Sequence, residues 1–333
     1  MKTSEIEGDI LSRDSLQSSI RRQFGLASDH RRVPAAEQGI ASVMVELYRN
    51  FDHPLEETTL FRWHGLLMQG RHDVKDVGCY RAHADPMQVV SGPLHELHVH
   101  FEAPPSDQMA FEMTRFVDWF AHSAPGGTRP LAPLARAGIA HLYFVSIHPF
   151  EDGNGRLARA LSEKCLAQGL GQPSLTALSV MMQQKRKQYY SVLERANKQC
   201  DATEWLLWFG EIARAAQQRT EGWIDFLIAK TRLLDRLRGR LNERQEKALL
   251  RMLHEGPEGF KGGLSAGNYV TITGTTPATA TRDLASLVTL GALTRTGELK
   301  GTRYWLVFIK TSRNIPAAPS PSLPRRSGRV RLA

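Results

Sequence analysis

A run of twelve residues in the middle of the chain combines side chains that bind phosphate with one that exchanges a proton. It reads His148-Pro149-Phe150-Glu151-Asp152-Gly153-Asn154-Gly155-Arg156-Leu157-Ala158-Arg159. Apolar residues recur with helical spacing on both sides, at 135–147 and 155–170, so the run is expected to be a loop that enters a helix. Glycines at a helix start let backbone N–H groups approach an anion closely. The spacing therefore predicts a phosphate-binding loop.

The charged side chains of this run extend the interpretation. Arg156 and Arg159 are three residues apart, so they share a helix face, and guanidinium groups suit phosphate oxygens. Asp152 would repel a bare phosphate, and its place beside the glycines favours a divalent cation such as Mg²⁺. His148 can accept a proton near neutral pH. Together these residues predict attack of a hydroxyl on a nucleotide phosphate; the alternative is a helix-capping loop with surface charges.

The run resembles the signature of the Fic (filamentation induced by cAMP) domain, H-x-F-x-(D/E)-G-N-G-R-x-x-R, at every defined position, and the resemblance extends over about residues 3–215. It implies an enzyme, a protein adenylyltransferase that transfers AMP from ATP to a Ser, Thr or Tyr hydroxyl of a target protein. By this resemblance His148 is the general base, Asp152 binds Mg²⁺ and Arg159 reaches the γ-phosphate. The residues implied to hold the α- and β-phosphates are Gly153, Asn154, Gly155 and Arg156.

A β-hairpin is predicted at 87–102, because 87–91 and 96–102 alternate and Gly92-Pro93 lies between them. An exposed strand edge can pair with an extended target segment and present its hydroxyl. The resemblance implies that the hairpin is the flap that clamps the target, with Val89, Val90, Ser91 and Gly92 touching the nucleotide. The alternative is an ordinary surface hairpin.

Two tyrosines and an asparagine share the predicted helix 185–198. Tyr189 and Tyr190 lie eight and seven residues before Asn197, hence on similar helix faces. The resemblance implies that these three residues lie beside the adenine and ribose. Without it, the tyrosines are equally well interpreted as core residues.

The amino end is predicted to be one helix over 5–24, with acids first and Arg21-Arg22 last. Residues 3–8, Thr-Ser-Glu-Ile-Glu-Gly, match the family's inhibitory pattern (S/T)-x-x-x-E-(G/N). The resemblance implies that Glu7 pairs with Arg159 where the γ-phosphate should bind and so inhibits the enzyme. The alternative is that Glu7 is an exposed acid at a helix start. Whether a further segment precedes residue 3 is left open.

The elements that carry these residues predict a mainly α protein: a Fic helical core with a short β-hairpin flap, followed by a small winged helix-turn-helix domain. The predicted segments are an inhibitory helix region at 1–30, the catalytic domain at 31–215, a connecting helix at 216–240, the winged helix at 241–310 and a basic disordered tail at 311–333. In the winged helix, Arg282 and Arg303 are candidate phosphate contacts. No dense Lys/Arg stripe accompanies them, so an architectural or homodimer-forming role is favoured over DNA binding.

Composition excludes several classes. With 41% hydrophobic and 23% charged residues, the chain is not wholly disordered. No apolar run approaches the roughly 18 residues of a membrane span and none resembles a signal peptide, so a cytoplasmic protein without a membrane partner is expected. Three cysteines are too few for a disulfide framework or a zinc cage. Five of the positive charges behind the net +9 lie in 311–333, and 9 − 5 leaves only +4.

The leading hypothesis is a self-inhibited protein adenylyltransferase that uses ATP and Mg²⁺. A second hypothesis is also an enzyme: a Fic protein that chiefly removes AMP from a modified protein and uses Glu7 to position water. A third is a DNA-binding regulator whose Fic region only senses nucleotide. His148 argues against the third, because a sensor needs no base.

Overall fold

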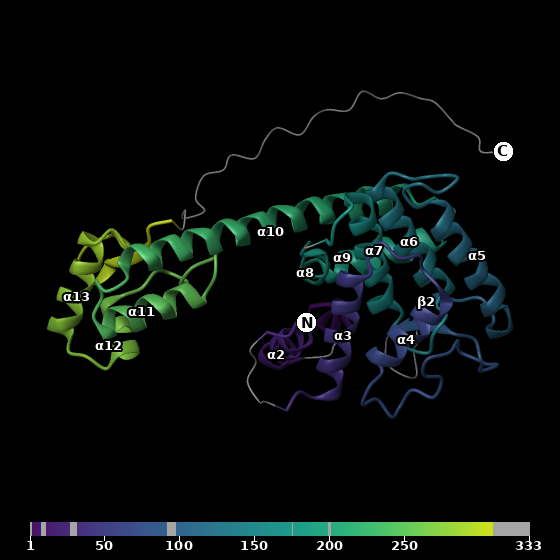
Figure 1. Ribbon diagram of the computed structural model, residues 1–333, viewed down its shortest axis with the longest axis horizontal. Helices are drawn as coiled ribbons and strands as arrows, with labels where there is room; N and C mark the ends of the chain where they lie inside the picture. Colours follow the sequence, from purple (N-terminus) through teal and green to yellow (C-terminus); the bar gives the residue numbers. More distant parts are fainter. Residues whose placement is uncertain are drawn as a thin grey trace, which may run out of the picture. The chain divides into compact units, whose positions relative to one another are not determined.

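The computed structural model describes residues 2–7, 11–26, 32–91, 98–174, 176–198 and 201–308, and the chain divides into two compact units, Met1–Glu221 and Gly222–Ala333. The predicted mainly α fold class is confirmed, because helices dominate and strands are few and short (Figure 1). Within the described ranges, no helix combines the length and the apolar character that a membrane crossing requires.

The first unit consists of helices and one hairpin, which lies at the edge of the helical body (Figure 1). Its helices are α1 (Lys2–Glu7), α2 (Arg13–Gln23), α3 (Ala35–Arg49), α4 (Glu57–Leu67), α5 (Met109–His122), α6 (Pro133–Ile147), α7 (Asn154–Leu170), α8 (Leu178–Gln184), α9 (Arg186–Lys198) and the start of α10 (Thr203–Leu237), with a 3-10 turn, η1 (Ser106–Gln108), before α5.

The central pair of helices, α6 and α7, holds the predicted phosphate loop between them. α6 begins with a proline in its first turn, and α7 begins after Gly153 in the left-handed conformation. Both suit helix starts, since proline needs no backbone N–H there and glycine tolerates a positive φ. Phe144 of α6 and Leu157 of α7 are completely buried in the core. The loop is therefore anchored at both ends by buried helix.

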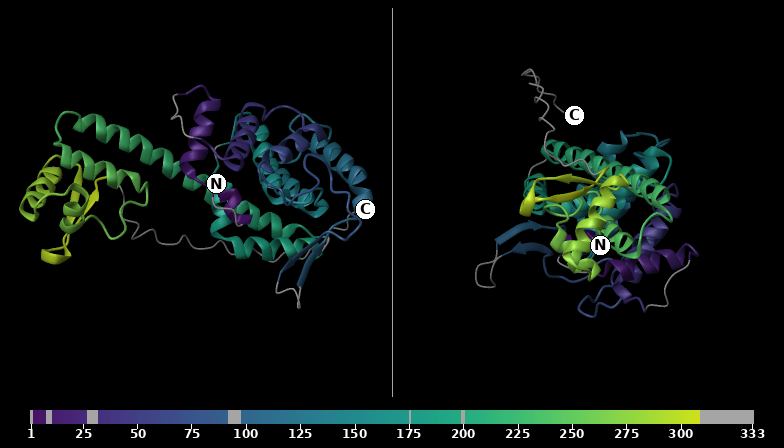
Figure 2. Two further views of the ribbon diagram at one scale, coloured as in Figure 1. Left: turned by 90° about the horizontal axis from the view of Figure 1, so that it is seen from below. Right: turned by 90° about the vertical axis from the view of Figure 1, so that its left-hand side faces the viewer.

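The hairpin consists of β1 (Gln88–Ser91) and β2 (His98–Glu102), which pair antiparallel with Gln88 opposite Glu102 (Figure 2). The pairing shifts register between Val89 and Val90. The predicted hairpin is confirmed for these strands. Gly92 and Pro93, the predicted turn, lie outside the described residues.

The prediction of a single amino-terminal helix is wrong. α1 ends at Glu7, and α2 begins only after Ser12, whose extended backbone and side chain cap the new helix. The Ser12 hydroxyl accepts the backbone N–H of Ser15 at 3.3 Å, which is the usual role of serine at a helix start. α1 nevertheless belongs to the first unit, because Ile6 is fully buried in its core.

The predicted helix at 216–240 is part of a longer helix, α10, which begins at Thr203. Its first turns carry Trp205 and Phe209, both fully buried in the core of the first unit. From Gly222 onward it belongs to the second unit, where Phe226 is buried. Apolar residues at helical spacing continue through the predicted boundary, so the helix does not stop there.

The second unit contains α11 (Glu243–His254), α12 (Ala266–Thr273), α13 (Pro277–Thr289), β3 (Leu293–Thr296), a 3-10 turn, η2 (Leu299–Gly301), and β4 (Arg303–Leu306). The strands pair antiparallel. Between α11 and α13, α12 begins with a reciprocal cap between Ser265 and Asn268. Assignment as a winged helix stays a prediction, and the tail at 311–333 lies outside the described residues.

Candidate active site

A cavity of about 800 Å³ in the first unit brings together most of the predicted site residues. It lies among α1, the hairpin, the 148–153 loop, the start of α7 and α9. The predicted residues that line it are Glu7, Val89, His148, Asp152, Gly153, Asn154, Gly155, Tyr189, Tyr190 and Asn197. Val90 and Ser91 are in β1, and Gly92 lies outside the described residues.

His148 follows the last turn of α6 in the left-handed conformation, with φ 52° and ψ 57°. Its backbone N–H donates to the carbonyl of Phe144 at 3.0 Å, and its Nδ1 lies 3.3 Å from the carbonyl oxygen of Val145. A carbonyl oxygen only accepts, so Nδ1 carries the proton of the neutral imidazole. The lone pair is therefore on Nε2, the atom that can take a proton from a substrate.

The surroundings of His148 keep its imidazole neutral. The pKa of His148 is lowered to about 4, chiefly by burial and to a smaller extent by the nearby positive charge of Arg81. The Val145 carbonyl and the carboxylates of Glu7 and Asp152 act in the opposite direction but do not prevail. At neutral pH the side chain is thus in the form that a general base requires.

Asn154 holds the phosphate loop in shape with its side chain. Oδ1 accepts the backbone N–H of Phe150 at 3.0 Å, and Nδ2 donates to the carbonyl of Phe150 at 2.8 Å. Asn154 is almost completely buried. Its amide is thus occupied within the protein, and the group it offers to a phosphate is its backbone N–H in the first turn of α7.

His64 supports the same loop from α4 and was missed by sequence reasoning. Its ring is fully buried and stacks on Phe150 with 4.2 Å between centroids. Nδ1 accepts the N–H of Gly78 at 3.0 Å, so Nε2 donates to the carbonyl of Asp152, 3.2 Å away. Burial lowers the pKa of His64 to about 4. Because 88 positions separate His64 from Asp152, no local spacing indicates this contact.

Glu151 ties the loop to the 71–78 segment. One carboxylate oxygen accepts the backbone N–H groups of Lys75 and Asp76 at 2.8 and 3.1 Å. In the signature this position is undefined, so the sequence assigned it no role.

Asp152 is the candidate metal ligand. Its half-exposed carboxylate lies 3.0 Å from Nη1 of Arg71 and 3.4 Å from Nη2 of Arg156. Among the described residues, no three His, Cys, Asp or Glu side chains gather as a metal cage. Mg²⁺ at nucleotide sites takes one or two carboxylates and completes its coordination with phosphate oxygens and water. A single carboxylate beside the start of α7 fits that donor set.

Glu7 contacts the first turns of α7. Nη2 of Arg159, a residue only 1% exposed, donates to Oε1 of Glu7 at 2.7 Å. A Cβ at Gly155 would lie 2.4 Å from that oxygen, so a side chain at position 155 would displace the carboxylate from this place. The hydroxyl of Tyr190 donates to Oε2 of Glu7 at 3.3 Å. The Glu7 carboxylate therefore engages the guanidinium of Arg159, the residue that the resemblance implies for the γ-phosphate.

The residues predicted beside the adenine differ in their surroundings. Tyr189 is buried and its hydroxyl lies 3.0 Å from Nε2 of His141, so it is a core residue that also borders the cavity. Tyr190 is more exposed and faces Glu7. Oδ1 of Asn197 accepts a hydrogen bond from the hydroxyl of Ser146 at 2.8 Å.

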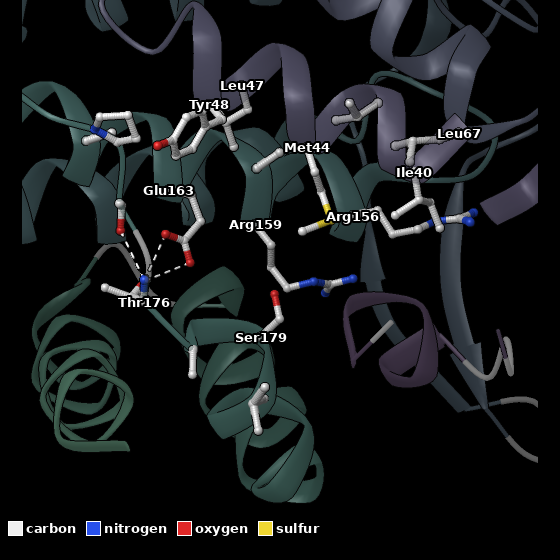
Figure 3. Close-up of a pocket in the computed structure, with 17 residues that line it drawn as sticks. Ile40, Met44, Leu47, Tyr48, Leu67, Arg156, Arg159, Glu163, Thr176 and Ser179 are labelled. Atoms are coloured by element: carbon white, nitrogen blue, oxygen red, sulfur yellow. Dashed lines mark hydrogen bonds between the residues drawn. The ribbon is translucent and has the colours of Figure 1, made fainter. Parts of the chain in front are cut away.

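A second cavity, of about 490 Å³, lies beside α3, α7 and α8 (Figure 3). Arg156 and Arg159 contribute to its wall, whereas its other lining is largely apolar. The Glu163 carboxylate accepts a hydrogen bond from the hydroxyl of Thr176 at 2.8 Å. Burial raises the pKa of Glu163 to about 7. His148 and the glycines of the loop line the larger cavity and not this one, whereas Arg156 and Arg159 line only this one.

Residues 54–166 match the model of the Fic/DOC family, and residues 1–26 match a domain of unknown function (DUF4172). The chain is similar to "Protein adenylyltransferase Fic" of Drosophila willistoni, with 33% identity over 117 residues. That match covers 35% of this chain and 22% of the relative, so it spans about a fifth of the relative's length.

Two solved structures share the fold. A Fic family protein from Desulfovibrio desulfuricans G20 has a TM-score of 0.50 and 22% identity, and the match covers 95% of this chain and 86% of that one. A Fic domain containing signaling protein from Bacteroides thetaiotaomicron has a TM-score of 0.50 and 20% identity, with 65% and 80% covered.

Proposed function

Because residues 54–166 match the model of the Fic/DOC family, we propose that this protein is a protein adenylyltransferase, which transfers AMP from ATP to a Ser, Thr or Tyr hydroxyl of a target protein. The observation that carries the proposal is the position of His148. Its neutral imidazole, with the lone pair on Nε2, lines the same cavity as the first turn of α7. A base and an anion site in one cavity suit attack on a phosphate.

In this proposal Nε2 of His148 takes the proton of the target hydroxyl as its oxygen attacks the α-phosphorus. The bond from that phosphorus to the pyrophosphate oxygen breaks, and pyrophosphate leaves. Backbone N–H groups at the start of α7, with Arg156 and Arg159, hold the phosphates. Asp152 would hold Mg²⁺, which neutralises phosphate charge when bound.

The hairpin and α9 complete the proposed site. The edge of β1 pairs with an extended segment of the target, which brings its hydroxyl toward His148 without reading its sequence. Val89 lines the cavity, and we propose nucleotide contacts for it and for Val90, Ser91 and Gly92. Adenine and ribose contacts are proposed for Tyr189, Tyr190 and Asn197, which line the same cavity.

Self-inhibition through Glu7 is the second part of the proposal. The Glu7 carboxylate pairs with Arg159, the arginine proposed for the γ-phosphate. Two anions cannot share one guanidinium edge without repulsion, so ATP binds with its triphosphate turned away from the line of attack. Displacement of Glu7 restores transfer.

Incubation with ATP labelled at the α-phosphate, in the presence of Mg²⁺, tests the activity. We expect label on the protein itself or on a lysate protein, more label with Glu7→Gly, and none above background with Glu7→Gly/His148→Ala. Loss of label from a pre-labelled target, without transfer, would indicate AMP removal instead. Absence of both reactions in every variant would contradict the proposal.

For the second unit we propose an architectural or homodimer-forming role rather than DNA binding. Arg282 is exposed on α13, but the guanidinium of Arg303 donates to the backbone carbonyls of Lys300 and Thr302, at 3.1 and 2.8 Å. One of the two candidate phosphate contacts is therefore engaged in its own loop. Strong, salt-sensitive binding of random duplex DNA by a protein lacking 311–333 would overturn this proposal.

A further inference from the structure

Arg81 lies in an irregular segment before β1 and is only 2% exposed. Its Nε donates to the carbonyl of His148 at 2.8 Å, and its backbone N–H donates to the carbonyl of Pro149 at 3.0 Å. The far side of the guanidinium donates to the hydroxyl of Ser106 at 2.7 Å and to the carbonyl of Pro104 at 2.5 Å. Every nitrogen of the guanidinium thus has a partner.

These partners belong to two different parts of the candidate site. His148 and Pro149 begin the phosphate loop, and the carbonyl that Arg81 holds belongs to the residue in the left-handed conformation. Pro104 and Ser106 follow directly after β2, the second strand of the hairpin. A planar guanidinium with donors in fixed directions sets the geometry between two such segments more rigidly than a flexible ammonium group does.

The burial of Arg81 marks this contact as unusual. An arginine stays protonated in a protein, and buried charges are ordinarily paired with an opposite charge. Among the described residues, the acceptors around Arg81 are two carbonyls and one hydroxyl rather than a carboxylate. The positive charge is therefore not neutralised by its partners, and its field reaches the imidazole of His148.

We propose that Arg81 is a positioning residue for AMP transfer: it holds the base, His148, at a set distance from the hairpin that receives the target. The inference rests on the proposed function, because it assumes that His148 is the base and that the hairpin binds the target. Two effects of Arg81 are separable. The N–H donors of its planar guanidinium (the fork) fix the distance between the phosphate loop and the hairpin. Its positive charge opposes protonation of His148.

The charge effect competes with other groups that face His148. Burial and Arg81 lower the pKa of His148, whereas the Val145 carbonyl, Glu7 and Asp152 raise it. Loss of the Arg81 charge should therefore move the titration of His148 to higher pH. Loss of the fork alone, with the charge retained, should leave the titration in place and lower the turnover number.

Two variants of the full chain, each with Glu7→Gly, separate these effects. Arg81→Lys keeps the charge and loses the fork, whereas Arg81→Gln loses both. Arg115→Gln is the matched control, because Arg115 is an exposed residue of α5 whose guanidinium lies 3.5 Å from Glu112. The measurements are kcat and KM for labelled ATP, the Kd of a non-hydrolysable ATP analogue, and the His148 pKa from an NMR titration of the imidazole.

We expect about a tenfold lower kcat for Arg81→Lys with the His148 pKa unchanged, and about a hundredfold lower kcat for Arg81→Gln with that pKa raised. Analogue affinity should stay within about twofold in both, because the phosphates are held by α7. A kcat in Arg81→Lys equal to that of Glu7→Gly alone, an unchanged His148 pKa in a folded Arg81→Gln, or analogue affinity that falls in step with kcat would each overturn the proposal. If no variant transfers AMP, the proposed function fails, and the titration alone then decides whether Arg81 acts on His148.

Discussion

Oε1 of Glu7 lies 2.7 Å from Nη2 of Arg159, although 152 positions separate the two residues in the chain. Arg159 is buried within α7, whereas the Glu7 side chain is 27% exposed at the end of a six-residue helix. The contact is therefore asymmetric. The arginine stays in place without its partner, but the short helix depends on its packing for its position, because an isolated helix of this length is unstable.

Glu7→Gly should raise AMP transfer at least about tenfold. A hydrogen bond between charged groups is worth about 1.5–3 kcal/mol, and removal of the carboxylate releases Arg159 for the γ-phosphate. The measurement is incorporation of α-labelled AMP per minute. Glu5→Gly is the matched control, because it introduces the same helix-weakening glycine two positions earlier in α1. Equal activation by both would contradict a specific role of the carboxylate.

Arg159→Ala should reverse the gain of Glu7→Gly and leave the inhibited wild type nearly unchanged. The arginine is needed for the γ-phosphate only once the glutamate is gone, so the two changes are not additive. A double-mutant cycle of labelling rates measures this coupling. Additive effects within about 0.5 kcal/mol would show that the two side chains act independently.

His148→Ala, on the Glu7→Gly background, should lower kcat by about 10²–10⁴, the range for loss of a general base. Nucleotide affinity should hardly change. The pH dependence of kcat offers a second check: since the pKa of His148 is lowered to about 4, activity should persist down to about pH 5. An acid limb with a midpoint near 6.5 would mean that the imidazole is not in this environment.

Mild acid should destabilise the first unit through its buried histidines. Burial lowers the pKa of His64 to about 4 and that of His141 to about 3, both below the unfolded value of 6.5. Between pH 6.5 and these values the unfolded chain binds protons that the folded chain does not. Stability is therefore lost as pH falls, by about 1.4 kcal/mol per pH unit for each histidine.

Urea unfolding of the full chain at pH 7.0, 6.0 and 5.0 measures this loss. His141→Gln should flatten the pH dependence of the unfolding free energy by about one histidine's share. The exposed His72→Gln is the control and should leave it unchanged. An equal slope in the wild type and His141→Gln would contradict the assignment of a neutral, buried imidazole at 141.

Asp283→Asn should weaken the second unit without affecting catalysis. The Asp283 carboxylate accepts from Nε of Arg244 at 2.9 Å, from the Tyr269 hydroxyl at 3.0 Å and from Nδ2 of Asn242 at 3.2 Å. An amide cannot accept all three, so a loss of about 1–3 kcal/mol is expected in hydrogen-exchange stability of α11 to α13. Labelling activity should match the wild type, and Asp235→Asn, at an exposed position of α10, is the control.

The sequence predicted the part of the site that lies close together along the chain. The loop, its glycines and its arginines are contiguous, so their spacing indicates both helix start and chemistry. His64 and Arg81 were missed, because each reaches the loop across 67 or more positions. His64 lies on the buried face of α4 like an ordinary core residue, and Arg81 lies outside any helix or strand. Such contacts depend on tertiary packing, for which a single sequence offers no local signal.

The helix boundaries that were predicted wrongly can be explained from the local sequence. Ser12 caps α2 and interrupts the predicted amino-terminal helix, and a serine before a helical run is a usual start signal. The reciprocal cap of Ser265 and Asn268, which begins α12, is a start signal of the same kind. The connecting helix was predicted to begin at 216, whereas α10 begins at Thr203. The first turns of α10 pack in the core of the first unit, so the amino-acid composition does not change at the predicted domain boundary.

The left-handed backbone of His148 places selection for folding and selection for function in conflict at one codon. Glycine and asparagine adopt a positive φ at less cost than a histidine does, so a library selected only for abundant, folded protein should enrich both at position 148. The same library selected for AMP transfer should retain histidine alone. Histidine at this position is thus retained for activity although inactive variants with glycine or asparagine would fold more stably, which is the pattern expected where activity and stability trade off.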